Sequence, residues 1–345
     1  MLEEFIISQF IRPLRSTYTM FDLGSNPFPT TYNDLVYRKD YQVFNNRRQT
    51  LQMSLYYKDA SLRIQPCVIY LHCNSGSRIE AQPYIPLLIR NGYAVCSFDF
   101  SGSGNSDGQY VTLGKNEKTD IDAIIKYLEQ LGFNQFFLWG RSMGAVTALL
   151  YMTTMKRSEN IIGLILDSPF SSLRKMSIEC GSEVTGVPEF LLHPMMLYVN
   201  SVINEKAGMQ LDDFEIKEFL RDYGRKMGIK LPPALFLTSH FDKVVKPYHV
   251  EELMGVYPGK TKQLKYMETK HDQERGSGII EFTVGFINEA MELKKTQFFQ
   301  TQNKRMNYER NLEKKQQMYG SLANSMMLSR APTTRMAGNP FNGLY

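Results

Sequence analysis

The stretch FFLWGRSMGAVTALL (residues 136–150) decides how the rest of the sequence is interpreted. Its first four residues are apolar strand formers, its last residues favour a helix, and GRSMG (residues 140–144) lies between them. The spacing G-x-S-x-G at a strand-to-helix turn is typical of a nucleophile elbow, where a strained backbone exposes the Ser hydroxyl. Gly140 and Gly144 fit such a turn because a Cβ at either place would collide with the neighbouring strand or helix. Ser142 is therefore the candidate nucleophile.

Strands and helices are expected to alternate on both sides of this stretch. Apolar runs bounded by turns predict strands at residues 67–71, 94–100, 136–139, 161–167, 234–238 and 263–267, with helices at 78–91, 116–131, 143–155, 248–256 and 278–293. Two runs rich in β-formers, 37–45 and 50–57, predict an antiparallel hairpin before the alternation begins. The predicted fold class is α/β: a mostly parallel sheet of about eight strands with helices on both faces.

The chain is expected to have three parts. Residues 1–36 form an N-terminal extension, residues 37–295 an α/β domain, and residues 296–345 a polar, basic tail in which Gln, Asn, Lys, Met and Ser prevail. Such a tail has too few clustered apolar residues to offset its ordering entropy, so we expect a short helical extension that passes into disorder. A partner-binding amphipathic helix over residues 298–319 is the alternative.

Residues 171–231 interrupt the alternation of strands and helices within the domain. Long insertions in parallel sheets commonly form lids above the carboxyl ends of the strands, where ligands bind. We therefore expect a helical cap here, with helices packed on the face of the sheet as the alternative.

Charge and composition limit the classes of function. A hydrophobic content of 43% in 345 residues is enough for a substantial core. The tail holds seven Lys or Arg and two Glu, and the rest of the chain balances at 33 basic and 33 acidic residues. The domain is therefore not expected to bind nucleic acid, and an anionic or protein partner could be bound only by the tail. No apolar run approaches the ~20 residues of a membrane span, and no secretory signal or paired-cysteine spacing is present, so a cytoplasmic protein is expected.

A serine hydroxyl needs a general base that is itself oriented by a carboxylate. The order Ser, acid, His is expected for a G-x-S-x-G site of this kind. Asp242 follows the strand predicted at 234–238, and His271 follows the one predicted at 263–267. We take Asp242 and His271 as the acid and base, with Asp167, at another predicted strand end, as the reserve acid.

An oxyanion that forms during hydrolysis is normally held by backbone N–H groups. Met143, directly after the nucleophile, is expected to supply one donor, and Asn74 or Cys73 the second. His72 is expected to brace that loop. The glycine-rich loop at residues 98–108 lacks the spacing and the following helix of a nucleotide site, and no metal-binding spacing occurs, so no cofactor or metal is expected.

Taken together, these motifs resemble the α/β-hydrolase superfamily, and within it the serine aminopeptidase-like hydrolases that include monoacylglycerol lipases and protein depalmitoylases. The matching segments are HCN (72–74), FDFSGSGNS (98–106), GRSMG (140–144), LDSPF (166–170), FDKVV (241–245) and KH (270–271). The resemblance implies acyl transfer to water at an ester, thioester or amide. The chain departs from the family at Cys73, where Gly is usual. It also departs from the depalmitoylase branch, which carries an N-terminal cysteine cluster, because residues 1–30 hold no cysteine.

The sequence thus predicts a serine hydrolase that acts on a small-molecule, acyl or peptidyl substrate through an acyl-enzyme on Ser142. The alternative is a non-catalytic scaffold of the same fold, for which Cys73 leaves room because a Cβ there narrows the oxyanion loop.

Overall fold

The computed structural model describes residues 2–58, 65–155, 158–227 and 231–328. The chain separates into two compact units, Met1–Met291 and Glu292–Tyr345. The first unit holds the sheet and every candidate site residue, and the second is described by itself below.

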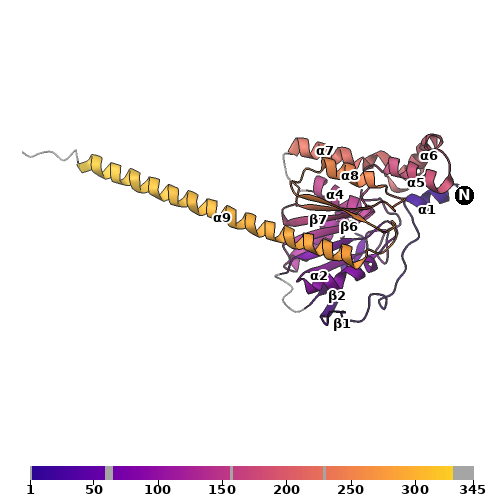
Figure 1. Cartoon of the computed structure of the whole chain (residues 1–345), viewed down its shortest axis with the longest axis horizontal. Helices are drawn as coiled ribbons and strands as arrows, with labels where there is room; N and C mark the ends of the chain where they lie inside the picture. The colour runs from indigo at the N-terminus through magenta and orange to yellow at the C-terminus, as the bar shows by residue number, and fades with distance from the viewer. Residues whose placement is uncertain (1, 59–64, 156–157, 228–230, 329–345) are drawn as a thin grey trace, which may run out of the picture. The chain divides into compact units, whose positions relative to one another are not determined.

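A nine-stranded sheet forms the centre of the first unit (Figure 1). Its order is β1-β2-β3-β5-β4-β6-β7-β8-β9; the pairs β1/β2, β2/β3 and β3/β5 are antiparallel and the others parallel. The strands are β1 (Phe28–Pro29), β2 (Leu35–Phe44), β3 (Thr50–Tyr57), β4 (Cys67–Leu71), β5 (Ala94–Phe98), β6 (Phe136–Arg141), β7 (Ile161–Asp167), β8 (Ala234–Ser239) and β9 (Lys262–Met267). The predicted α/β class and hairpin are confirmed. The ninth strand, β1, has only two residues and therefore leaves no periodic pattern in the sequence.

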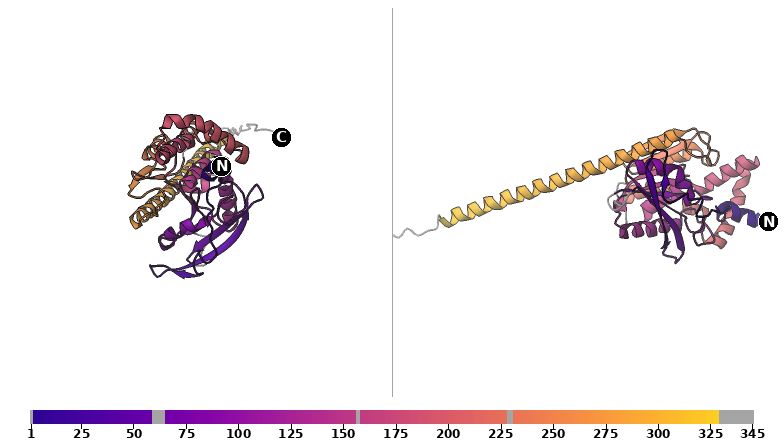
Figure 2. Two further views of the ribbon diagram at one scale, coloured as in Figure 1. Left: turned by 90° about the vertical axis from the view of Figure 1, so that its right-hand side faces the viewer. Right: turned by 90° about the horizontal axis from the view of Figure 1, so that it is seen from below.

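Helices cover both faces of this sheet, as predicted (Figures 1 and 2). One face carries α3 (Glu117–Gln130), α4 (Met143–Thr154) and α8 (Pro247–Val256); the other carries η2 (Arg78–Tyr84), α2 (Ile85–Arg90) and the first part of α9 (Ser277–Leu328). A short η3 (Ser158–Asn160) precedes β7. Two apolar clusters result, one on each side of the strands, because residues of β4 to β8 are buried on both faces.

The segment predicted as a cap contains α5 (Leu173–Thr185), α6 (Glu189–Ala207), η4 (Leu211–Phe214) and α7 (Ile216–Met227). Helix α5 packs on α6 and lies beside the Asp242 loop, since Lys243 pairs with Glu183 at 2.6 Å. Helix α7 packs against α4 and α8, which is the sheet-face position named as the alternative. The insertion therefore divides between the two expected positions, and its role as a cap stays a prediction.

The N-terminal segment packs into the first unit. Helix α1 (Leu2–Phe10) lies against α6 and buries Ile6 and Ile7. The chain then passes the glycine-rich loop, where Arg15 donates to backbone carbonyls that include Gly104 O at 2.7 Å and Ser103 O at 3.2 Å. An arginine that satisfies several carbonyls of one loop fixes the conformation of that loop.

Helix α9 continues to Leu328, beyond the helix predicted at 278–293 and through much of the segment in which only a short helical extension was expected. In the second unit it exposes aromatic and aliphatic side chains, among them Phe298, Phe299, Tyr308 and Leu312. The predicted partner of this segment stays a prediction. The disorder predicted for the later part of residues 296–345 can be compared with the structure only as far as residue 328, and the rest lies outside the described residues.

The close contact between α4 and β4 generates a prediction about stability. A Cβ at Gly144 would lie 2.0 Å from the carbonyl oxygen of Leu71, which is backbone that has no side-chain freedom to yield. We expect Gly144→Ala to lower the free energy of unfolding by about 1–3 kcal/mol, which is the usual cost of overpacking. Chemical denaturation followed by circular dichroism measures the change.

Gly255→Ala is the matched control, because Gly255 lies in α8 and a Cβ there meets no atom within 4 Å. This variant should gain roughly 0.5–1 kcal/mol from reduced backbone entropy of the unfolded chain. Equal effects of the two substitutions would contradict the close-contact argument.

Candidate active site

Ser142 lies in the turn between β6 and α4, with φ 51° and ψ −115°. This is a conformation that L-residues rarely adopt, and it matches the strained elbow expected from the sequence. A Cβ at Gly140 would lie 2.4 Å from atoms of Gly144 and Ala145, so both glycines of the motif are required by space. The Ser142 N–H donates to the carbonyl of Asp167 at 2.7 Å, which fixes the turn to the end of β7.

The structure brings Ser142, His271 and Asp242 together. His271 Nε2 is 3.1 Å from Ser142 Oγ, and His271 Nδ1 is 2.7 Å from Asp242 Oδ2. His271 follows β9 and Asp242 follows β8, while Ser142 follows β6. Parallel strands end at one edge of the sheet, so three residues distant in sequence meet there.

Asp242 is held as a carboxylate. Its Oδ1 accepts from the N–H groups of Val244 at 2.9 Å and Val245 at 2.8 Å. Burial by itself raises the pKa of Asp242, but the contact with His271 and these two N–H donors together lower it by more, so the pKa lies below its ordinary value. A charged acceptor therefore faces Nδ1 of His271 and can keep the Nε2 lone pair directed at Ser142.

Two backbone N–H groups were expected to bind an oxyanion. Met143 is the first residue of α4, where N–H groups have no partner within the helix. Cys73 N–H, one of the two alternatives for the second donor, instead donates to Glu80 Oε2 at 3.2 Å. Asn74, the other alternative, therefore remains the candidate for the second donor. Burial and the nearby Glu80 raise the pKa of the Cys73 thiol to about 12, so this thiol stays protonated.

The reserve acid Asp167 has a different partner. Its two carboxylate oxygens accept from Arg275 at 2.7 and 3.0 Å, and both side chains are only 1% exposed. Asp167 therefore forms a buried, two-point ion pair, while His271 Nδ1 binds Asp242.

The other histidines lie outside this contact. His72 lies in the loop after β4, where its Nε2 accepts from Phe100 N–H at 3.0 Å and its Nδ1 is 2.7 Å from the carbonyl oxygen of Cys73; its bracing of an oxyanion loop stays a prediction. His193 is exposed on α6, His240 stacks on Tyr266, and His249 is fully buried beneath the insertion.

Sequence reasoning did not identify Glu80, Arg141 or Arg275, which surround these residues. Arg141 occupies the variable position of G-x-S-x-G and is mostly buried, with a side chain 9% exposed. The signal available in the sequence was its place inside the motif at the end of an apolar strand, where a charged residue needs a partner.

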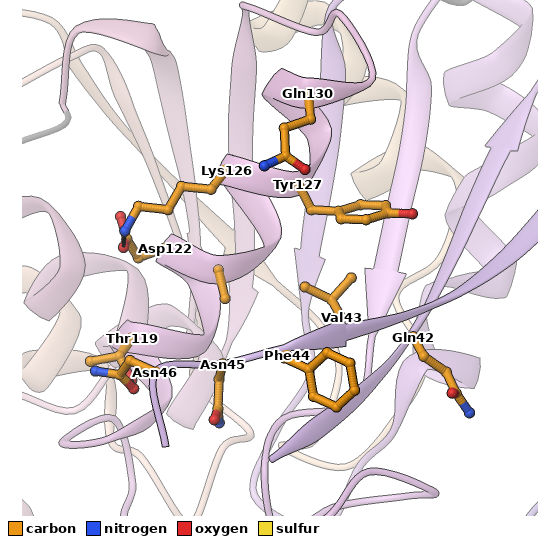
Figure 3. A pocket seen from close by; sticks show the side chains of 11 residues that line it. Gln42, Val43, Phe44, Asn45, Asn46, Thr119, Asp122, Lys126, Tyr127 and Gln130 are labelled. Carbon is orange, nitrogen blue, oxygen red and sulfur yellow. Dashed lines mark hydrogen bonds and ion pairs between the residues drawn. The ribbon is translucent and has the colours of Figure 1, made fainter. Parts of the chain in front are cut away.

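A surface pocket of about 400 Å³ lies elsewhere, between the end of β2 and the outer side of α3 (Figure 3). Its walls include Phe44, Lys126 and Tyr127. Within the described residues, no group of three His, Cys, Asp or Glu side chains is arranged to hold a metal ion. Across the same part of the chain, no helix has both the length and the apolar character that crossing a membrane requires.

Comparison with known proteins adds to this geometry. A family model described as serine aminopeptidase, S33, matches residues 67–206. The Pf2001 esterase of Pyrococcus furiosus has the same fold, with a TM-score of 0.60 at 21% identity over 82% of this chain and 98% of that one. The chain has the α/β-hydrolase fold, and it resembles the serine aminopeptidase-like hydrolases of that superfamily over residues 67–206.

Curated proteins match only part of the chain. Bovine lysophosphatidylserine lipase ABHD12 is 30% identical over 128 residues, which are 35% of this chain and 31% of the relative. An uncharacterized membrane protein of Saccharomyces cerevisiae is 27% identical over 178 residues, 50% of this chain and 52% of the relative. The match thus spans between about a third and a half of these relatives' length.

His249 provides a test of the charges around the insertion. Its Nδ1 contacts Ser171 Oγ at 2.8 Å and its Nε2 contacts Tyr248 at 2.9 Å. Burial lowers the pKa of His249 from 6.5 to about 4, despite the opposing effect of Glu179. In the unfolded chain His249 is protonated below about pH 6.5, whereas in the folded protein it stays neutral down to about pH 4. The free energy of unfolding therefore falls as the pH falls from 6.5 to 4.

We expect the free energy of unfolding to drop by about 2–3 kcal/mol more in the wild type than in His249→Gln between pH 7 and pH 4.5. Denaturant titrations at the two pH values measure the difference. The same drop in both proteins would show that His249 is not held neutral by burial.

Proposed function

We propose that this protein is a serine hydrolase that cleaves an ester, thioester or amide through an acyl-enzyme on Ser142. The observation that carries the proposal is the continuous hydrogen-bonded contact from Ser142 Oγ through the His271 imidazole to Asp242. This is the arrangement that activates an alcohol oxygen at neutral pH.

The chemistry follows from the positions of these groups. His271 Nε2 accepts the proton of Ser142 Oγ as the oxygen attacks the substrate carbonyl carbon. The N–H groups of Met143 and Asn74 bind the oxyanion of the tetrahedral intermediate. His271 then returns the proton to the leaving group, and a water molecule repeats the sequence to release the acid. Asp242 holds the imidazole in the required tautomer and stabilises its charged form.

Carboxylic esters with an apolar acyl chain are the proposed preferred substrates. The similar proteins named above include a lipase and an esterase. Helix α6 of the insertion exposes Phe190, Leu191 and Leu197, and it has no charged residue from Phe190 to Ile203. Helix α6 packs on α5, which lies beside the Asp242 loop, and an apolar helix in this insertion favours an apolar substrate over a charged peptide.

Covalent labelling tests the nucleophile. A fluorophosphonate probe should label the wild-type protein and fail to label Ser142→Ala, because only an activated serine attacks phosphorus. The same substitution should lower kcat for p-nitrophenyl butyrate hydrolysis by ~10⁴-fold or more. Ser201→Ala, at an exposed position of α6, is the control and should label normally. A folded wild type that is not labelled would favour the scaffold alternative.

A substrate series tests the acyl preference. For p-nitrophenyl esters from C2 to C8, kcat/KM should rise by up to roughly fourfold per methylene, which is the value of ~0.8 kcal/mol for each buried CH₂. Acyl thioesters and aminoacyl amides of matched length complete the comparison. A flat or falling series, with faster cleavage of aminoacyl amides, would assign the site to peptides instead.

A further inference from the structure

Two arginines hold the loop that carries His271. Arg141 Nη2 and Arg275 Nη2 both donate to the backbone carbonyl of His271, the latter at 3.4 Å. Arg275 also donates to the carbonyls of Lys270 and Gln273, each at 2.9 Å. The carbonyl and the imidazole of His271 belong to one residue, so fixing this carbonyl limits how far the ring can move from Ser142.

Arg141 reaches a second loop through Glu80. Arg141 Nη1 donates to Glu80 Oε1 at 3.3 Å, an oxygen that also accepts from the hydroxyl of Tyr70 at 2.9 Å. The other oxygen, Oε2, accepts from Cys73 N–H in the oxyanion loop at 3.2 Å. One carboxylate and one guanidinium therefore join the backbone of the oxyanion loop to the backbone of the histidine loop.

This bridge is shielded from solvent. The side chains of Arg141 and Glu80 are 9% and 14% exposed. Burial alone lowers the pKa of Arg141, but Glu80 and neighbouring groups outweigh it, and the pKa lies above its ordinary value. A buried ion pair adds little net stability because desolvation offsets its attraction, so its contribution is better sought in geometry.

We propose that Glu80 and Arg141 are positioning residues that hold the oxyanion loop and His271 in register with Ser142. The proposal rests on the serine hydrolase function proposed above. It assigns Cys73 N–H a structural role: by binding Glu80, this group sets the loop so that the next residue, Asn74, faces the reacting carbonyl.

Glu80→Gln is the sharpest variant because it keeps the size of the side chain. Glu80 accepts hydrogen bonds on both oxygens, whereas glutamine has one acceptor oxygen and places an NH₂ group against a donor. The variant must therefore lose either Arg141 or Cys73 N–H. Arg141→Met removes the bridge from the other side and retains the apolar stem.

Hydrolysis of p-nitrophenyl butyrate by the full chain provides the test. We expect kcat to fall about 10-fold in Glu80→Gln and about 10²-fold in Arg141→Met, since small displacements of catalytic groups have such effects. KM should stay within about twofold, because neither side chain is expected to contact the acyl chain. The double variant should lose about as much as Arg141→Met alone, because both changes break one bridge.

Arg38→Met is the matched control. Arg38 is also buried, pairs with Asp40 at 3.0 Å and donates to loop carbonyls, but it lies on β2, which is separated from β6 by three strands. It should lose thermal stability and retain wild-type kcat once folded.

The outcomes separate the two proposals. If the wild type is labelled by a fluorophosphonate and both site variants keep kcat within about twofold, the positioning roles are overturned while the hydrolase remains. A loss of kcat in Arg38→Met equal to that in Arg141→Met also overturns them, since it marks a general effect of destabilisation. Failure to label folded wild type overturns the hydrolase function and the positioning roles with it.

Discussion

The site depends on the close approach of α4 to strand β4. Gly144 leaves no room for a Cβ beside the Leu71 carbonyl, and two residues earlier the chain turns sharply at Ser142 with positive φ. The strain is held by the hydrogen bond from Ser142 N–H to the Asp167 carbonyl and by the start of α4. Strain at a single residue persists only where the surroundings over-determine it, and here three strands and a helix do so.

Two carboxylates at neighbouring strand ends are given different tasks by their surroundings. Asp167 is neutralised by the two-point contact with Arg275 and is almost fully buried. Asp242 receives two backbone N–H donors on one oxygen and leaves the other for His271. The two carboxylates occupy equivalent places at the ends of β7 and β8, but their surroundings differ. Asp167 therefore anchors Arg275 and the loop that carries it, whereas Asp242 faces His271.

The fold class could be predicted from the sequence, and so could the meeting of the three candidate site residues at one edge of the sheet. Continuous apolar runs identify parallel strands, and residues directly after such strands must meet, so Ser142, Asp242 and His271 could be named. The pairing of Arg141 with Glu80 could not be, because the partners are 61 positions apart and no periodicity links them. The hydrogen bond from Cys73 N–H to Glu80 could not be predicted for the same reason. The sequence therefore left Cys73 and Asn74 as equal candidates for the second oxyanion donor.

The N-terminal segment shows what periodicity leaves out. Arg15 binds carbonyls of the glycine-rich loop, and Tyr18 donates to the buried Asp99. Ser16 Oγ is 3.0 Å from Ser77 Oγ, in the loop after β4. Arg78 N–H donates to the same Asp99 carboxylate at 2.7 Å. None of these contacts belongs to a regular strand or helix, so a pattern of apolar residues does not reveal them. Residues that precede the first long strand nevertheless brace the two loops beside the candidate active site, because buried polar backbone there must find donors and no sheet supplies them.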